Sequence, residues 1–127
     1  MIPAQVDRFR RSVGRLTTLL SYWTPPRFSA AASPLLVDAV SALCVTSGSA
    51  LDEGVTVADR LHVVVQVLAD LGADAEGQPR RAVPRTAEPG ALVDQLTVLG
   101  NDLVAADPDA EELDRVTRSL DALRAAL

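Results

Sequence analysis

The sequence contains no lysine, one cysteine, one histidine and few aromatic residues. Because aromatic residues make up only 3% of the chain, the core must be built from leucine, valine and alanine, and little aromatic surface is left for stacking on bases or sugars. A single cysteine excludes an internal disulfide, which fits a reducing cytoplasm. All twelve basic residues are arginine, a bias that we attribute to a GC-rich genome rather than to function.

Long apolar runs are also missing. No apolar segment approaches the roughly 20 residues needed to cross a bilayer, and the opening residues MIPAQVDRFRR lack the apolar stretch of a signal peptide. The net charge of −5 and the pI of about 4.7 argue against a general nucleic-acid binder. We therefore expect a soluble, cytoplasmic protein that binds no nucleic acid.

The chain has 127 residues, of which 48% are hydrophobic, and this suits one globular domain over residues 1–127. Its most apolar stretch, Val57 to Leu71, is apolar around most of a helix, which predicts a helix with neighbours on most sides. Thr56 and Asp59 have the spacing of a capping box, and Gly72 suits the left-handed residue that ends a helix. A β-branched run within residues 62–67 leaves a buried strand as the alternative.

Apolar residues at alternating spacings of three and four predict the other helices. The first seam runs from Val6 to Trp23, and Pro25 ends that helix. Asp107 is a suitable cap before Pro108, so this short joint predicts that the last two helices are adjacent and antiparallel. The predicted fold is all-α, a compact bundle of about five helices with the third at its centre, at residues 6–23, 34–46, 57–71, 90–106 and 108–126.

Residues 73–89 form a Pro/Arg-rich segment with almost no apolar content. A loop of this length is unusual inside a compact domain, so it is either disordered or functional. Its arginines Arg80, Arg81 and Arg85 make it locally basic, and they match no proline-rich ligand motif. If it is disordered, trypsin should cut there first.

The sequence offers few candidate residues for metal binding or catalysis. Asp59 and His62 have a D-x-x-H spacing, but a di-metal bundle needs that motif twice, and the chain has one histidine. Their spacing favours a polar stripe at a helix–helix boundary, which Gln66 and Asp70 continue on the same side. Cys44 lies on an apolar face with no neighbouring cation in sequence, which favours a buried, inert thiol.

No phosphate-binding loop, nucleophile elbow or zinc motif occurs, so an enzyme is disfavoured and we expect no cofactor and no metal. The alternative is a small-ligand-binding or enzymatic bundle. Its candidate pocket would be formed by Cys44, Asp59, His62 and Gln66.

Charge is unevenly placed along the chain. Residues 1–27 carry a net charge of +4 and the remainder −9. Arg8, Arg11 and Arg15 lie opposite the apolar seam of the first helix. The favoured interpretation is that they pair with acidic residues of this chain, such as those in 109–114, or of a second copy. Contact with a membrane surface through the first helix is a weaker alternative.

Several apolar side chains lie off the predicted helix seams and would be exposed on a monomer. Exposed apolar surface on a small protein usually marks a contact, and a twofold dimer is the commonest way to cover it. We therefore expect a non-enzymatic interaction or regulatory module, a homodimer or a partner of another protein. The candidate interface is formed by Arg8, Arg11, Arg15, Leu19, Val93, Val98 and Val104.

Overall fold

A computed structural model describes residues 3–50, 54–86 and 88–127. Its described residues form helices and no strand beyond one isolated bridge, so the all-α prediction is confirmed, whereas the expected count of five helices is wrong. The six helices are α1 (Pro3–Ser21), α2 (Pro25–Ser29), α3 (Pro34–Ser47), α4 (Val57–Glu76), α5 (Pro89–Ala105) and α6 (Ala110–Ala126).

The short helix α2 is the element that the sequence pattern did not predict. Pro25 ends α1 as expected, but it also begins a new turn, because proline is well suited to the first helical position. This turn buries Phe28 against Trp23, with the two ring centroids 5.2 Å apart in an edge-on arrangement. The guanidinium of Arg27 lies 4.2 Å from the centre of the Trp23 ring.

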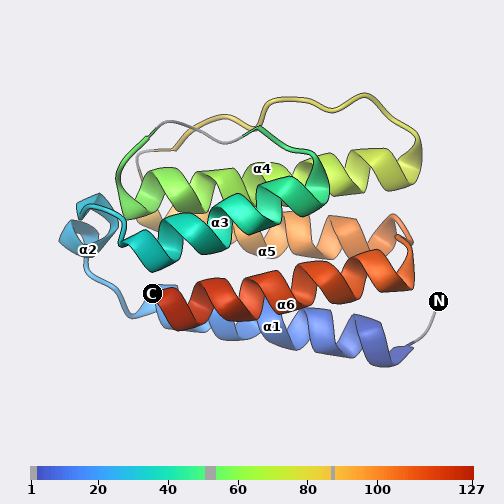
Figure 1. Cartoon of the computed structure of the whole chain (residues 1–127), viewed down its shortest axis with the longest axis horizontal. Coiled ribbons are helices and arrows are strands. Elements are labelled where there is room, and N and C mark those ends of the chain that lie inside the picture. The colour runs from blue at the N-terminus through green and yellow to red at the C-terminus, as the bar shows by residue number, and fades with distance from the viewer. Residues whose placement is uncertain (1–2, 51–53, 87) are drawn as a thin grey trace.

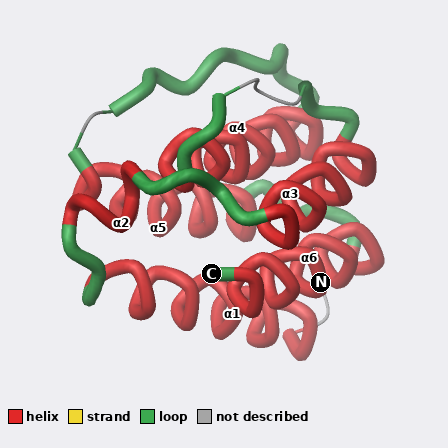
Figure 2. Tube along the Cα trace, turned by 60° about the vertical axis from the view of Figure 1, so that its left-hand side comes forward, coloured by secondary structure: helices red, strands yellow, loops and turns green. Residues whose placement is uncertain are grey.

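The five long helices are arranged as a ring (Figure 2). Going around it, α1 packs on α6, α6 on α3, α3 on α4, α4 on α5, and α5 on α1. The core lies inside the ring and is lined by leucine and valine from all five helices. The prediction for the last two helices is therefore only half right: α6 runs antiparallel to α5 but packs mainly on α1 and α3.

The directions of the helices explain why the connections between α3 and α4 and between α4 and α5 are long. The helices α3, α4 and α5 all run the same way, while α1 and α6 run the opposite way (Figure 1). Parallel neighbours need a return segment as long as the helix itself. The 20 residues of α4 span roughly 30 Å, and an extended chain covers about 3.3 Å per residue. The proline-rich segment between α4 and α5 is therefore as long as the topology requires.

The most apolar stretch forms α4 as predicted, and the strand alternative for residues 62–67 does not occur. Thr56 and Asp59 form the expected capping box. The expected end at Gly72 is wrong, because the helix continues to Gly77, which adopts the left-handed conformation with φ of 69°. Gly72 instead lies beside α5, where an added Cβ would be 4.0 Å from the Cα of Leu103.

The helix α4 is buried on most sides, and Leu68 in its middle is only 1% exposed. Its close helical neighbours are α2, α3 and α5 rather than all the other helices. The remaining side of α4 carries the polar stripe of Asp59, His62, Gln66 and Asp70. A non-helical segment covers that side, as described below.

Candidate functional site

Residues 78–86, here called the strap, run back along the outside of α4 (Figure 1). The strap has no helix or strand of its own, yet hydrogen bonds hold it to the helices at several points. It belongs to the segment 73–89 that the sequence predicted to be either disordered or functional. The predicted bounds are too wide, because residues 73–76 continue α4 and Pro89 begins α5. The order of the strap comes from the polar stripe of α4 beneath it.

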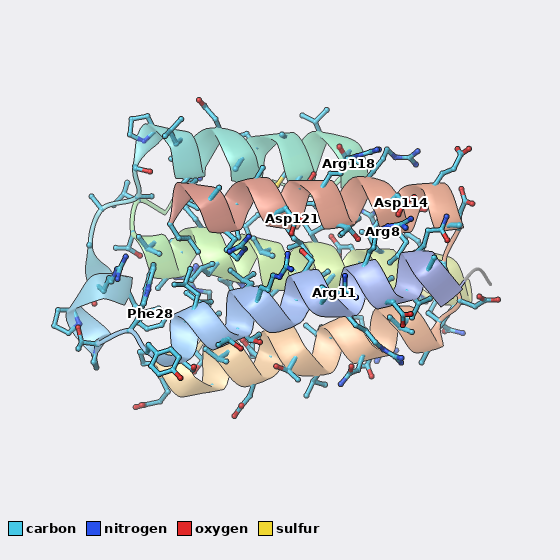
Figure 3. The ribbon with its side chains drawn as sticks, turned by 90° about the horizontal axis from the view of Figure 1, so that it is seen from below. Arg8, Arg11, Phe28, Asp114, Arg118 and Asp121 are labelled. Atoms are coloured by element: carbon cyan, nitrogen blue, oxygen red, sulfur yellow. The ribbon has the colours of Figure 1, made fainter. Side chains whose placement is uncertain are left out.

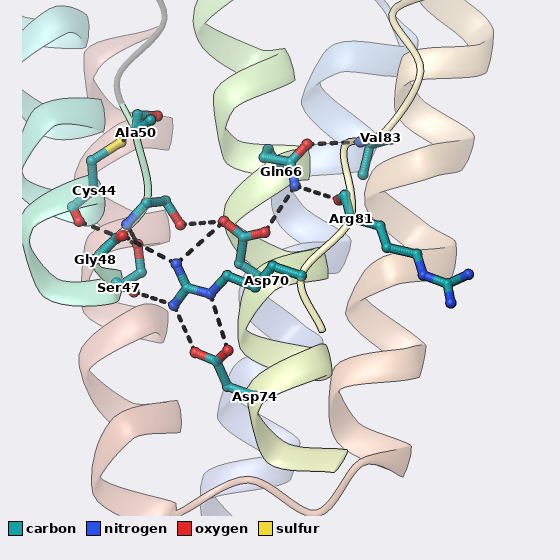
Figure 4. A network of polar contacts seen from close by, with 11 residues as sticks. Cys44, Ser47, Gly48, Ala50, Gln66, Asp70, Asp74, Arg81 and Val83 are labelled. Atoms are coloured by element: carbon teal, nitrogen blue, oxygen red, sulfur yellow. Dashed lines mark hydrogen bonds and ion pairs between the residues drawn. The ribbon is translucent and has the colours of Figure 1, made fainter. Parts of the chain in front are cut away.

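At the first contact, Arg80 links the strap to α3 and α4. Figure 4 shows the polar network around Asp70 and Asp74 to which this contact belongs. The Arg80 guanidinium donates to the carbonyl oxygens of Ser47 and Gly48 at 2.8 and 3.0 Å, which caps the C-terminal end of α3. The same group pairs with Asp74 at 2.6 Å and lies 3.7 Å from Asp70. A cation at this end of a helix is favourable because the helix dipole is negative there. Hydrogen bonding to Arg80 lowers the pKa of Asp74.

Asp70 is the buried acceptor of this network, and it is only 5% exposed. It accepts a hydrogen bond of 2.6 Å from the hydroxyl of Ser49 and one of 2.8 Å from the amide of Gln66. A buried carboxylate is costly unless it is paired and hydrogen-bonded, and here the neighbouring Arg80 supplies the opposite charge.

Gln66 holds the middle of the strap through its main chain. The side-chain amide donates to the carbonyl oxygen of Arg81 at 2.9 Å, and its oxygen accepts from the backbone N–H of Val83 at 2.8 Å. This pair of bonds satisfies backbone groups that an isolated loop would leave to solvent. The Val83 side chain then packs against the core.

The far end of the strap is fixed at the start of α4. Arg85 forms an ion pair with Asp59, whose carboxylate also accepts from the backbone N–H of Thr56 at 3.0 Å. The bond from Thr56 and then the bond from Arg85 lower the pKa of Asp59 from its ordinary 3.8 to about 2. The carboxylate is therefore ionised throughout the neutral range.

The four residues of the predicted pocket are not gathered into one site. Asp59 and Gln66 bind the strap, and His62 lies half-buried between them on the polar stripe. Cys44 is buried at the end of α3, where its thiol lies 3.9 Å from the carbonyl oxygen of Ala50 and burial raises its pKa. Among the residues described, no cluster of three or more His, Cys, Asp or Glu side chains is placed to hold a metal.

A cleft of about 540 Å³ does exist, but it lies further along α4. It is bounded by α4, by α5 and by the first half of the strap, and its lining includes Leu68, Gly72, Val83 and Leu99. None of the four residues of the candidate pocket, Cys44, Asp59, His62 and Gln66, lines it.

The opposite side of the molecule presents α1 and α6, and here the predicted arginine stripe is exposed (Figure 3). Arg8 pairs with Asp114 of α6 at 3.1 Å, which confirms for this residue the interpretation that the stripe meets the chain's own acids. Ser12 donates to Asp121 at 2.7 Å. Within the described part of the chain, the guanidinium groups of Arg11 and Arg15 make no ion pair or hydrogen bond.

An open, mostly apolar groove of about 700 Å³ lies beside these two arginines. We call it the α1–α6 groove, and it is lined by Arg11, Gly14, Arg15, Thr18, Leu19, Tyr22 and Arg124. Tyr22 is 84% exposed at one end. Tyr22 is not among the residues of the candidate interface expected from the sequence.

The other predicted interface residues behave differently from one another. Val98 on α5 is 56% exposed, as expected. Leu19 and Val93 are only partly exposed, and Val93 packs against the core. Val104 is only 8% exposed, so the expectation that it is left over for a partner is wrong. It is buried because α5 packs on both α1 and α4, so a wider arc of the helix than the leucine face is covered.

Two exposed apolar side chains, Leu35 and Val45, were not predicted as surface residues. Both lie on α3, whose only charged residue is Asp38.

No described helix is long and apolar enough to traverse a lipid bilayer. No protein-family model, curated protein or solved structure matches this chain. Function is therefore inferred from the geometry of the chain itself.

Proposed function

We propose that this chain is a non-catalytic interaction module that forms a twofold dimer through the α1–α6 groove. The observation that carries the proposal is the contrast between neighbouring arginines. Arg8 is neutralised by Asp114, while Arg11, Arg15 and Arg124 flank the apolar groove without an ion pair among the residues described. A groove with an apolar floor and a charged rim is the usual anatomy of a protein contact.

The distribution of charge favours a second copy as the partner. The helices α1 and α6 run in the same direction. Each helix carries an acid near its N-terminal end, Asp7 on α1 and Glu111 on α6. An arginine of the groove lies further along each helix, Arg15 on α1 and Arg124 on α6. Two copies that approach in antiparallel orientation place the basic part of each on the acidic part of the other. One self-complementary patch then serves both copies.

The chain's single thiol is buried rather than exposed as a nucleophile, which is consistent with a non-catalytic role. The Cys44 thiol is buried and its pKa is raised, so the thiolate needed for reaction is disfavoured. On the polar stripe of α4, Gln66 and Asp59 both bind the strap. This arrangement gives Gln66 and Asp59 structural roles.

Light scattering over the micromolar range tests the dimer. We expect a mass of twice the 13.4 kDa of one chain. The double variant R11E/R15E should shift the protein to monomer, because like charges would then face each other. The matched control is R10E on the same helix, since Arg10 is equally exposed but lies on the flank toward α5.

A charge-swap experiment separates direct contact from general destabilisation. The variant D7R/E111R should also be monomeric, and its mixture with R11E/R15E should restore a dimer. A monomer mass for the natural chain across the range, or a dimer that survives R11E/R15E unchanged, would rule out this interface.

A further inference from the structure

We propose that the cleft between α4, α5 and the strap binds a small apolar molecule that carries a protonated amine. The cleft has a volume of about 540 Å³, which falls within the range of small-molecule sites. This site lies apart from the α1–α6 groove and does not depend on the dimer.

The apolar walls of the cleft come from three segments. Leu68 of α4 and Leu99 of α5 form the floor, and Val83 of the strap forms part of the roof. Gly72 leaves space between the two helices, because the nearest atom to an added Cβ would be 4.0 Å away. An alkyl chain or small ring in this space would exchange water contact for contact with these side chains.

The walls are held in place before any ligand arrives. The main chain of the strap is fixed by Gln66 at the carbonyl of Arg81 and at the N–H of Val83. Arg80 fixes the strap at one end and Arg85 at the other. A preformed site spends little binding free energy on ordering its own walls.

The charge around the cleft favours a cation. Glu76 and Asp102 line it together with one basic residue, Arg81, so its ionised side chains sum to a negative charge. Both α4 and α5 end here, and because they are parallel their negative dipole ends add. An anionic ligand would meet two carboxylates and two helix C-termini for a single guanidinium.

Arg81 does not close the site. Its side chain points away from the polar network of the strap and toward α5 (Figure 4). Within the described residues its guanidinium forms no ion pair, unlike those of Arg80 and Arg85. We therefore assign Glu76 and Asp102, rather than Arg81, to the recognition of the ligand's ammonium group.

Three probes of equal length test the proposal: hexylamine, hexanol and hexanoate. Binding is followed by chemical shifts of backbone amides at pH 7 and low salt. We expect hexylamine to bind about tenfold more tightly than hexanol and hexanoate to bind most weakly, with shifts centred on Leu68, Gly72 and Leu99. Added salt should reduce the preference for the amine.

The double variant E76Q/D102N should reduce hexylamine affinity to that of hexanol while leaving hexanol unchanged. Both residues are exposed, so folding is not at risk. The control is D94N, an exposed carboxylate of α5 outside the cleft. The variant A73L, which adds bulk to the lining, should weaken both probes. Hexanoate binding as tightly as hexylamine, shifts centred elsewhere, or no binding of any probe at millimolar concentration would overturn the proposal.

Discussion

Arginines of the strap and arginines of α1 lie on opposite sides of the molecule and have opposite surroundings (Figure 1). Arg80 and Arg85 come from a segment without regular structure, yet each pairs with a carboxylate of α4. Arg11 and Arg15 come from a regular helix, yet neither has an ion pair among the residues described. Arg80 and Arg85 therefore use their charge within the chain, while Arg11 and Arg15 leave theirs available to a partner.

The physical reason lies in what each segment needs. The backbone groups of a helix are hydrogen-bonded to one another, so its solvent-facing side chains are not needed to satisfy them. The strap has no such ladder and depends on side chains of α4, which is why Gln66 binds its main chain at two points. The amino-acid composition alone does not distinguish arginines that pair within the chain from arginines that remain exposed. The predictions below test the difference.

The largest loss of stability should come from substitutions in the hydrophobic core, which lies between the strap side and the α1 side of the molecule. We expect Leu68→Ala, below the strap, and Leu16→Ala, in α1, each to lower the free energy of unfolding by about 2–5 kcal/mol through lost burial and cavity formation. Urea denaturation measures both. A loss at Leu68 below about half a kcal/mol would show that α4 is peripheral.

The next effect isolates the strap. Arg80→Ala should cost about 1–3 kcal/mol, because it uncaps α3 and leaves the buried Asp70 without its nearby cation. Trypsin should then cut faster at Arg81, since the strap opens more often. Arg81→Ala is the matched control and should change stability little, as its guanidinium has no partner among the described residues. Equal losses in the two variants would contradict the assigned roles.

Helix content was predictable because it follows from local apolar spacing, as in Val57–Leu71, and the capping box at Thr56 was readable directly. The polar stripe was expected at a helix–helix boundary and instead lies under the strap. The strap could not be foreseen because it has no apolar periodicity to read. The end of α4 was missed because Gly72 and Gly77 both suit a helix end and only packing against α5 decides between them. The length of the proline-rich segment was the sequence feature that could have indicated that α4 and α5 are parallel.

A smaller effect concerns acid stability at the far end of the strap. The pKa of Asp59 is lowered to about 2, so its ionised form contributes stability that is present above the ordinary carboxyl pKa and lost as pH falls toward 2. We expect natural protein to exceed Asp59→Asn by up to about 2 kcal/mol at neutral pH. Urea denaturation should show this difference shrinking below pH 4. A difference that is constant with pH would show that Asp59 acts without its charge.

The smallest effect distinguishes the paired arginine of α1 from its unpaired neighbour. Arg8 and Asp114 are 51% and 30% exposed, so solvent screens their attraction, and we expect a coupling of only about 0.2–1 kcal/mol. A double-mutant cycle with Arg8→Ala and Asp114→Ala measures this coupling at concentrations where the chain is monomeric. The same cycle with Arg11→Ala and Asp114→Ala should give no coupling, since these two side chains form no ion pair. Equal coupling in both cycles would mean that Arg11 also forms an ion pair within the chain. The contrast between a paired Arg8 and an unpaired Arg11, on which the proposed interface rests, would then be lost.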